Sequence, residues 1–378
     1  MSAKIRVLVV DDSALMRKLI PQVLQRDPSI EVVGTAMDGS IGLKKIEELH
    51  PSVVTLDLDM PRMDGLEMLR QITRRFHIPV IVVSAHTAHG ASLTLKALAL
   101  GAFDFVTKPQ EAAAGRLDQI AAELALKIKV AQASGAPKMI ITEPAGKQHL
   151  PVKSSTQPRW PSRIVAIGVS TGGPQALQYL FSQLPADFPG CILIVQHMPE
   201  GFTEMFSQRL NESSAMEIKE AQSGDLLLAG RALICPGNRH IKVRRMEHGN
   251  IAILVDQPRV NGHRPSVDVL FNSVAQEFGA KTMAVLMTGM GEDGAAGLGA
   301  VQTAGGFTIA QSPDSCVVDS MPRSAINRGF ATRVVSLSNL ASVIQSKCLP
   351  ERSTDGSDAS ASSAIETIGQ GSSQRRSS

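Results

Sequence analysis

Three polar side chains in the second half of the chain are of the types that ester or amide hydrolysis needs. Ser170 lies in the segment GVSTGGP, between an apolar run and a stretch with helical spacing. His197, in VQHMP, and Asp293, in TGMGEDGAAG, each follow a further apolar run. The carboxyl ends of parallel strands meet at one edge of a sheet, so we expect the three side chains to converge there. A nucleophilic serine, a base that takes its proton and a carboxylate that orients the base make up a catalytic triad.

The glycines around Ser170 favour a nucleophile over a phosphate site. GVSTG fits the pattern G-x-S-x-G, in which a serine occupies a tight strand-to-helix turn. A phosphate-binding loop would place a lysine before Ser or Thr, and a dinucleotide-binding turn would read G-x-G-x-x-G; this segment has neither. The order serine, histidine, aspartate along the chain also differs from the serine, acid, histidine order of ordinary α/β-hydrolases. Taken singly, a histidine or aspartate at a strand end is usually a cap, and it is the combination that indicates a site.

A second set of polar residues follows the apolar runs of the first half. Asp11 and Asp12 follow the first run and Asp57 ends the third. Ser84 ends the fourth run and Lys108 follows the fifth. Three carboxylates at one sheet edge repel one another unless a divalent cation lies among them, and such oxygen ligands suit Mg²⁺. The set therefore predicts a site where Asp57 accepts a phosphoryl group whose charge is neutralised by the cation and Lys108.

The elements that must hold these residues alternate between strand and helix. The strands expected in the first half are 5–10, 29–36, 52–57, 79–84 and 103–107. Those expected in the second half are 163–169, 191–197, 231–237 and 282–289, with a hairpin over 240–255. Apolar strands separated by helices predict parallel sheets covered on both faces. The expected fold is α/β, an N-terminal (βα)5 domain followed by a doubly wound, mainly parallel-sheet domain.

Composition divides the chain into four parts. We expect a first domain over 1–125, a linker over 126–162 rich in Pro, Ser and Gly, and a second domain over 163–349. The Ser-rich segment 350–378 has few apolar residues and is expected to be a disordered tail.

The charge balance excludes several classes of partner. There are 38 Lys and Arg against 35 Asp and Glu, and only 3% of residues are aromatic, which argues against nucleic-acid binding. The apolar runs are shorter than a membrane span, so we expect no membrane insertion. The four cysteines form no CxxC pair, which favours reduced thiols and a cytoplasmic protein.

Over about residues 4–125, the chain resembles the receiver domain of two-component response regulators. The resemblance rests on the set of polar residues in the first half, namely Asp11, Asp12, Asp57, Ser84 and Lys108. The resemblance implies that Asp57 is the phosphoacceptor and that Ser84 and Lys108 contact the phosphoryl group. The Mg²⁺ ligands that it implies are Asp11, Asp12, Asp57 and the backbone carbonyl of Asp59. Phe105 stands where receivers often carry a switching aromatic residue.

Behind that receiver and linker, GVSTGGP, VQHMP and TGMGEDGAAG resemble the chemotaxis protein-glutamate methylesterases (CheB family), over roughly residues 4–345. The resemblance implies a triad of Ser170, His197 and Asp293 that hydrolyses glutamate γ-methyl esters on chemoreceptors and releases methanol. Some members also deamidate glutamines. The backbone N–H groups of Thr171 and Met290 are the expected oxyanion donors.

The resemblance also implies partners and a form of control. The substrate would be a methyl-accepting chemoreceptor and the phosphodonor a chemotaxis-type histidine kinase; Mg²⁺ would serve the receiver, and the esterase would need no cofactor. We expect the unphosphorylated receiver to cover the groove around Ser170. The alternative is a response regulator with a non-catalytic binding output, although the second domain lacks a helix-turn-helix pattern. Among nearby residues, we expect Cys235 to be a buried thiol, Arg264 or Ser266 to contact substrate, and His240 and His263 to lie at the surface or in the substrate groove.

Overall fold

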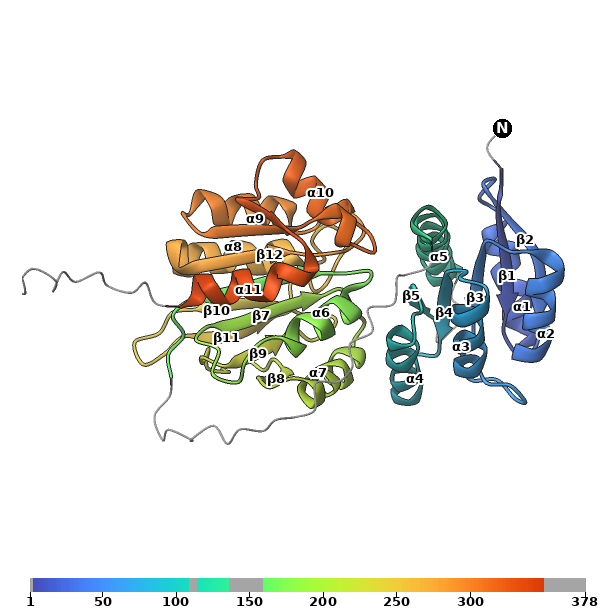
Figure 1. Cartoon of the computed structure of the whole chain (residues 1–378), viewed down its shortest axis with the longest axis horizontal. Coiled ribbons are helices and arrows are strands. Elements are labelled where there is room, and N and C mark those ends of the chain that lie inside the picture. Colours follow the sequence, from blue (N-terminus) through green and yellow to red (C-terminus); the bar gives the residue numbers. More distant parts are fainter. Residues whose placement is uncertain (1–2, 109–113, 136–158, 350–378) are drawn as a thin grey trace, which may run out of the picture.

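The computed structural model describes residues 3–108, 114–135 and 159–349, which form two α/β units (Figure 1). The N-terminal unit has a five-stranded parallel sheet in the order β2-β1-β3-β4-β5. Its strands are β1 (Ile5–Val10), β2 (Ile30–Ala36), β3 (Val53–Leu56), β4 (Val80–Ser84) and β5 (Asp104–Thr107). Its helices are α1 (Ala14–Leu24), α2 (Gly39–Leu49), α3 (Gly65–Arg75), α4 (Ala88–Ala99) and α5 (Ala114–Ser134).

The apolar run of β1 shows why this sheet is covered on both faces. Val7 and Val9 pack in the cluster that contains residues of α1 and α5. Leu8 and Val10 point the other way, into the cluster that contains residues of α2, α3 and α4. Since successive side chains of a strand alternate between faces, a continuous apolar strand needs helices on both sides. Helices α1 to α4 each begin at a side-chain cap, namely Ser13, Asp38, Asp64 and Thr87.

The C-terminal unit is built around a seven-stranded parallel sheet in the order β14-β13-β12-β6-β7-β9-β8. Its strands are β6 (Ile164–Val169), β7 (Cys191–Gln196), β8 (Glu217–Glu220), β9 (Arg231–Ile234), β12 (Thr282–Leu286), β13 (Phe307–Gln311) and β14 (Arg333–Val335). A separate antiparallel hairpin is formed by β10 (His240–Arg244) and β11 (Ile251–Val255). The helices are α6 (Gly173–Ser182), α7 (Phe202–Ser213), α8 (Val267–Phe278), α9 (Ala295–Thr303), α10 (Ser320–Asn327) and α11 (Leu337–Cys348).

The direction of winding reverses at β6. From β6 the chain proceeds to β7 on one side, and it later returns to lay β12, β13 and β14 on the other side. Such a reversal opens a crevice at the carboxyl ends of the central strands, which is where ligands of doubly wound sheets bind. The doubly wound α/β fold expected from the sequence is therefore confirmed.

One detail of the sheet differs from the expectations. The sheet also contains β8, β13 and β14, which were not among the strands expected from the sequence. Helix α5 continues to Ser134, with Ile128 and Ala131 buried. The division into domains, with its boundary at residue 125, stays a prediction. Most of the expected linker and the Ser-rich tail lie outside the described residues. Among those that are described, no helix combines the length and the hydropathy required to cross a bilayer.

The receiver-like unit packs against the C-terminal unit through α4, which contacts both α6 and α7 (Figure 1). The side chain of Gln175, in α6, donates a hydrogen bond of 2.5 Å to the backbone oxygen of Leu98 in α4. Phe105, in β5, stacks on Phe202 at the start of α7, with ring centroids 5.1 Å apart. Polar and aromatic contacts thus fix how the two units meet.

Gly168, in β6, tests how closely the central strand packs. A Cβ atom there would overlap Val267, the first residue of α8. Gly168→Ala should therefore lower the free energy of unfolding by about 1–3 kcal/mol, because the helix must move away from the sheet. Chemical unfolding followed by the fluorescence of Trp160, the single tryptophan of the chain, measures this loss. Adding Val267→Ala should recover part of it, and a double variant that loses the sum of the two single effects contradicts the packing argument.

Candidate active site

The turn that carries Ser170 is held by backbone hydrogen bonds. It follows β6 directly, and α6 begins three residues later at Gly173. The Ser170 N–H donates to the Thr288 carbonyl at 3.0 Å, and the Gly173 N–H donates to the Ser170 carbonyl at 2.8 Å. Gly172 has a φ of 77°, and a Cβ on Gly173 would overlap the Gln196 side chain. Glycines stand at positions 172 and 173 because Val317 and Gln196 leave no room there for a Cβ atom.

His197 directly follows β7, the neighbour of β6. Its backbone N–H donates to the Val169 carbonyl at 3.1 Å, which places it beside the serine turn. Its Nε2 lies 2.8 Å from Oδ2 of Asp293, and its side chain is only 8% exposed. The other ring nitrogen, Nδ1, is buried without a hydrogen-bond partner, and among the described residues no hydrogen bond joins the Ser170 hydroxyl to His197. With Nε2 donating to the carboxylate, Nδ1 is the nitrogen that remains able to accept a proton.

Asp293 follows β12 and is almost completely buried, at 1% exposure. Its carboxylate accepts hydrogen bonds from His197 Nε2, Val267 N, Asn261 Nδ2, Ser266 Oγ and Asp268 N. Burial alone would raise the pKa of this carboxyl, but the hydrogen bonds from His197 and the other donors outweigh burial and lower the pKa. Asp293 is therefore a fixed negative charge that holds His197 in one tautomer.

A turn over 260–264 covers this pair. Asn261 adopts the left-handed region, with φ 53°, and donates to Asp293 Oδ1 at 2.9 Å and to Asp268 Oδ2 at 2.7 Å. Two residues later, the His263 ring lies parallel to the His197 ring, with centroids 3.8 Å apart and planes at 4°. Burial, and next to it the charge of His197, lower the pKa of His263 to about 4. The pair is thus enclosed by an amide on the acid and a neutral ring on the base.

One expected oxyanion donor, Thr171, lies in the serine turn, and the other, Met290, follows Gly289, whose backbone lies against Ser170. Among the described residues, neither the Thr171 N–H nor the Met290 N–H has a hydrogen-bond partner. The next N–H along, that of Gly291, is used by Ser320 Oγ at 3.0 Å. Two free donors near the serine suit a developing oxyanion, and their role stays a prediction.

The receiver-like unit covers this region. The hydroxyl of Thr171, the residue after Ser170, donates to Oδ2 of Asp104 in β5 at 2.6 Å, and Thr171 is only 4% exposed. Lys127, in α5, lies 3.4 Å from Asp104 and donates to the Phe105 carbonyl at 2.6 Å. Burial alone would lower the pKa of Lys127, but the carboxylates of Asp104 and Glu123 outweigh burial and raise it. A buried ionic group of the receiver-like unit therefore touches the residue next to the serine.

The acid site of the receiver-like unit is assembled as the sequence predicts. Asp11, Asp12 and Asp57 each offer an oxygen within 4.8 Å of the others. Lys108 Nζ lies 2.7 Å from Asp57 and 2.9 Å from Asp11. Burial raises the pKa of Asp57, with Lys108 opposing it. Burial alone would lower the pKa of Lys108, but the charges of Asp57 and Asp11 outweigh the effect of burial, and the pKa of Lys108 is raised. Clustered carboxylates with one of them exposed to solvent fit a hydrated Mg²⁺.

Ser84 and Asp59 line the same pocket. The Ser84 hydroxyl donates to the Gly90 carbonyl at 3.1 Å, so it is turned toward α4. The Asp59 N–H approaches Asp57 Oδ1 at 3.4 Å. Two residues after Ser84, His86 packs on Phe202 with ring centroids 6.0 Å apart. The loop after β4 thus joins the acid site to the contact between the units.

Comparison with known proteins agrees with this division. The family described as CheB methylesterase matches residues 165–344, and the response regulator receiver domain matches residues 7–119. A protein-glutamate methylesterase/protein-glutamine glutaminase 2 of Koribacter versatilis is 62% identical over 356 residues, covering 92% of this chain and 97% of the relative. A protein-glutamate methylesterase/protein-glutamine glutaminase of Symbiobacterium thermophilum is 45% identical, covering 90% of this chain and 96% of the relative. The chain belongs to the CheB methylesterase family.

Within this methylesterase fold, several neighbours of the triad were missed or misplaced by sequence reasoning. His240 is fully buried, where its Nδ1 accepts from the Ser266 N–H and its Nε2 pairs with the Pro258 carbonyl, so the expectation of a position at the surface or in the substrate groove was wrong. Ser266 bonds Asp293 instead of facing a substrate. Cys235 is a buried thiol, as expected. Asp104 was missed, although a charged residue inside the apolar run FDFVT was a visible signal.

The lowered pKa of His263 predicts a pH dependence of stability. The folded chain keeps His263 neutral down to about pH 4, whereas the unfolded chain protonates it near 6.5. The unfolded state therefore binds the extra proton first, and the methylesterase should lose stability as the pH falls from 6.5 toward 4, on the order of 2–3 kcal/mol from this residue. The measurement is the Trp160 unfolding midpoint at pH 7 and pH 5.

His263→Phe removes the titration and should flatten that dependence relative to the natural chain. His248→Ala, which replaces an exposed histidine of the hairpin turn, should leave it unchanged. Identical pH dependence in the natural chain and the Phe variant contradicts the burial argument.

Proposed function

We propose that this chain is a phosphorylation-activated serine hydrolase that demethylates glutamate γ-methyl esters on chemoreceptors, with glutamine deamidation as a second reaction of the same site. The observation that carries the proposal is the buried His197–Asp293 pair beside the serine turn, at the switch point of the sheet. Relatives named for this activity, at up to 62% identity among those compared, support the choice of substrate. The four free cysteines of the described residues support a cytoplasmic location.

The chemistry follows from the unused nitrogen of His197. Nδ1 takes the proton of Ser170 as its oxygen attacks the ester carbonyl, and Asp293 stabilises the imidazolium that forms. The Thr171 and Met290 N–H groups bind the oxyanion. His197 returns the proton to the departing methanol. Water then attacks the acyl-enzyme with His197 again as base, which frees the glutamate carboxylate and restores Ser170.

The receiver controls access to this chemistry. Asp57 accepts a phosphoryl group from a histidine kinase, and Lys108 pairs with the added charge. Asp11, Asp12, Asp57 and the Asp59 carbonyl would hold Mg²⁺, which would supply charge neutralisation for this transfer. Two aromatic contacts on Phe202, from His86 and Phe105, support a path by which a change at Asp57 loosens the interface.

The hydrolase assignment predicts that Ser170→Ala releases almost no methanol from methyl-labelled receptors. Asp293→Asn should lower kcat by roughly 10³–10⁴-fold, because a neutral amide cannot stabilise the imidazolium. Its NH₂ group would also face N–H and O–H donors that now bond the carboxylate. Methanol release is measured with full-length protein, Mg²⁺ and a small phosphodonor, and Ser338→Ala, an exposed serine, is the matched control. Normal release from Ser170→Ala means that the nucleophile is wrongly assigned.

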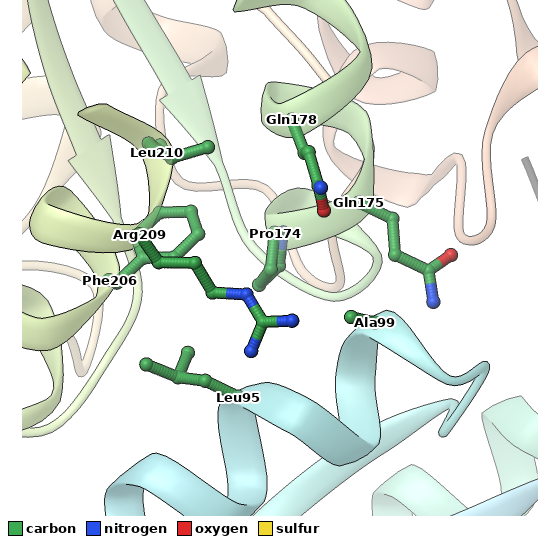
Figure 2. A pocket seen from close by; sticks show the side chains of 8 residues that line it. All are labelled: Leu95, Ala99, Pro174, Gln175, Gln178, Phe206, Arg209 and Leu210. Atoms are coloured by element: carbon green, nitrogen blue, oxygen red, sulfur yellow. The ribbon is translucent and has the colours of Figure 1, made fainter. Parts of the chain in front are cut away.

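The covering role of the receiver predicts the effect of charge at the interface. Ala99 of α4 lines a pocket with Arg209 of α7, and Figure 2 shows the Arg209 side chain reaching toward α4. Burial lowers the pKa of Arg209, with Glu212 opposing it, and no ion pair of Arg209 occurs among the described residues. Ala99→Arg would bring a second guanidinium into this partly buried contact, where like charges repel by on the order of 2 kcal/mol. Methanol release without phosphodonor should rise roughly thirtyfold, since each 1.4 kcal/mol is about a factor of ten.

Ala133→Arg adds the same charge at an exposed position of α5 and should leave that unphosphorylated rate unchanged. Asp57→Asn in the Ala99→Arg background should keep the raised rate, because opening then no longer needs phosphorylation. If Ala99→Arg folds and still shows the low rate of the natural chain, the interface does not restrain the enzyme.

A further inference from the structure

The stacked ring of His263 has no part in the mechanism above, yet no other aromatic ring lies as close to His197 among the described residues. Their centroids are 3.8 Å apart and their planes differ by 4°. His263 is half-buried, and it lies in the turn over 260–264, outside the elements of the sheet. An imidazole laid flat on the proposed base calls for an explanation beyond filling space.

The turn that presents His263 is rigid at both ends. Val260 and His263 exchange two backbone hydrogen bonds, of 2.9 and 3.0 Å. Arg264, the next residue, is tied to Asn238 and to Asp256. Between them, Asn261 is anchored to Asp293. The same short turn therefore fixes the acid through Asn261 and faces the base with His263.

The contacts of His197 explain what the stacked ring can do. The hydrogen bond from Nε2 to Asp293 fixes one atom of the ring, and Nδ1 has no partner that would fix the other side. The ring therefore remains free to tilt about the hydrogen bond unless something covers its face. A parallel ring at van der Waals distance resists that tilt and excludes water from one side.

Charge favours a neutral ring in this place. When His197 takes a proton, an uncharged aromatic face beside it attracts the cation, whereas a second cation would repel it. The low pKa of His263 keeps it uncharged at neutral pH. The groups that act on its charge are His197, Asp293, Arg259 and, from the receiver-like unit, Lys127. Three of these four disfavour protonation and only Asp293 favours it.

We propose that His263 is a positioning residue, whose uncharged ring holds the His197 ring in the plane that directs Nδ1 toward Ser170 and stabilises the imidazolium. The inference rests on the proposed function for its natural substrate, but proton transfer from Ser170 can be measured without that substrate.

The test compares His263→Ala, His263→Phe and His263→Arg in the full-length chain with Mg²⁺ and a small phosphodonor. Two rates are measured for each variant: methanol release from methylated receptors, and covalent labelling of Ser170 by a fluorophosphonate. Ala removes the ring and should lower kcat and the labelling rate by roughly 10²-fold with KM nearly unchanged, since misplacement of a base by about 1 Å has this effect. Phe restores a flat uncharged face and should recover both rates to within about threefold.

The Arg variant tests a property that a purely structural role of His263 would not change, namely the pH dependence of the rate. Its guanidinium is planar but always charged, so it disfavours protonation of His197. The acid limb of kcat/KM, or of the labelling rate, should shift to lower pH in the Arg variant than in the Phe variant. His248→Ala is the matched control and should behave as the natural chain.

The outcomes separate the inference from the proposed function. If the natural chain is labelled at Ser170 but releases no methanol, the proposed substrate is wrong, and the labelling rates of the variants still decide the role of His263. An Ala variant labelled as fast as the natural chain, or a Phe variant as slow as Ala, overturns the inference. If Ala fails to fold, Phe and Arg still decide it, since equal acid limbs overturn it. A natural chain that resists labelling as fully as Ser170→Ala overturns both proposals.

Discussion

The C-terminal site depends on one buried negative charge. Asp293 is 1% exposed, and an unpaired carboxylate in such a place is strongly unfavourable. Five donors offset that penalty, and they come from the turn over 260–264, the start of α8 and the end of β7. Movement of any one of these segments would take at least one donor away from the buried charge. The requirement to satisfy Asp293 therefore links the elements that frame the serine turn, and the site is assembled as a consequence of folding.

A second buried carboxylate, that of Asp268, lies next to Asp293 and also needs hydrogen-bond donors. Asp268 accepts hydrogen bonds from the Gly297 N–H at 2.6 Å and from Asn261 Nδ2 at 2.7 Å. Burial raises the pKa of Asp268, and the nearby charge of Asp293 adds to that rise. The amide of Asn261 lies between the two carboxylates and donates to both, which reduces their repulsion. Position 261 needs a residue that tolerates left-handed backbone and has a side-chain NH₂ group with two hydrogens, and Asn meets both needs. The same turn also carries His263.

Sequence patterns located the centre of the site but not its supports. Ser170, His197 and Asp293 could be placed together because each follows a continuous apolar strand of a parallel sheet, and topology then fixes the edge. Strand β8, with the sequence EIKE, has no such run, since it lies at the sheet edge and is only partly buried. Asn261 and Lys127 had no local signal at all. Asn261 matters through a turn that folds back on Asp293, and Lys127 matters through a contact between two units that lie far apart in the sequence.

The contact between the units has an apolar part and a polar part, which differ in how strictly they depend on geometry. Stacking of Phe105 on Phe202 favours association of the two units in many relative orientations. The hydrogen bond from Thr171 to Asp104, by contrast, forms in only one orientation. Buried ionic groups such as Lys127 and Asp104 add little net stability, because desolvation offsets their attraction. We propose that their directional hydrogen bonds instead favour a single register of the two units. A shift of about 1–3 kcal/mol, the usual size of coupling between two sites, is then enough to open the interface. Because the Thr171 hydroxyl bonds Asp104, an opening of the kind proposed above would uncover the turn of the proposed nucleophile together with its unpaired N–H.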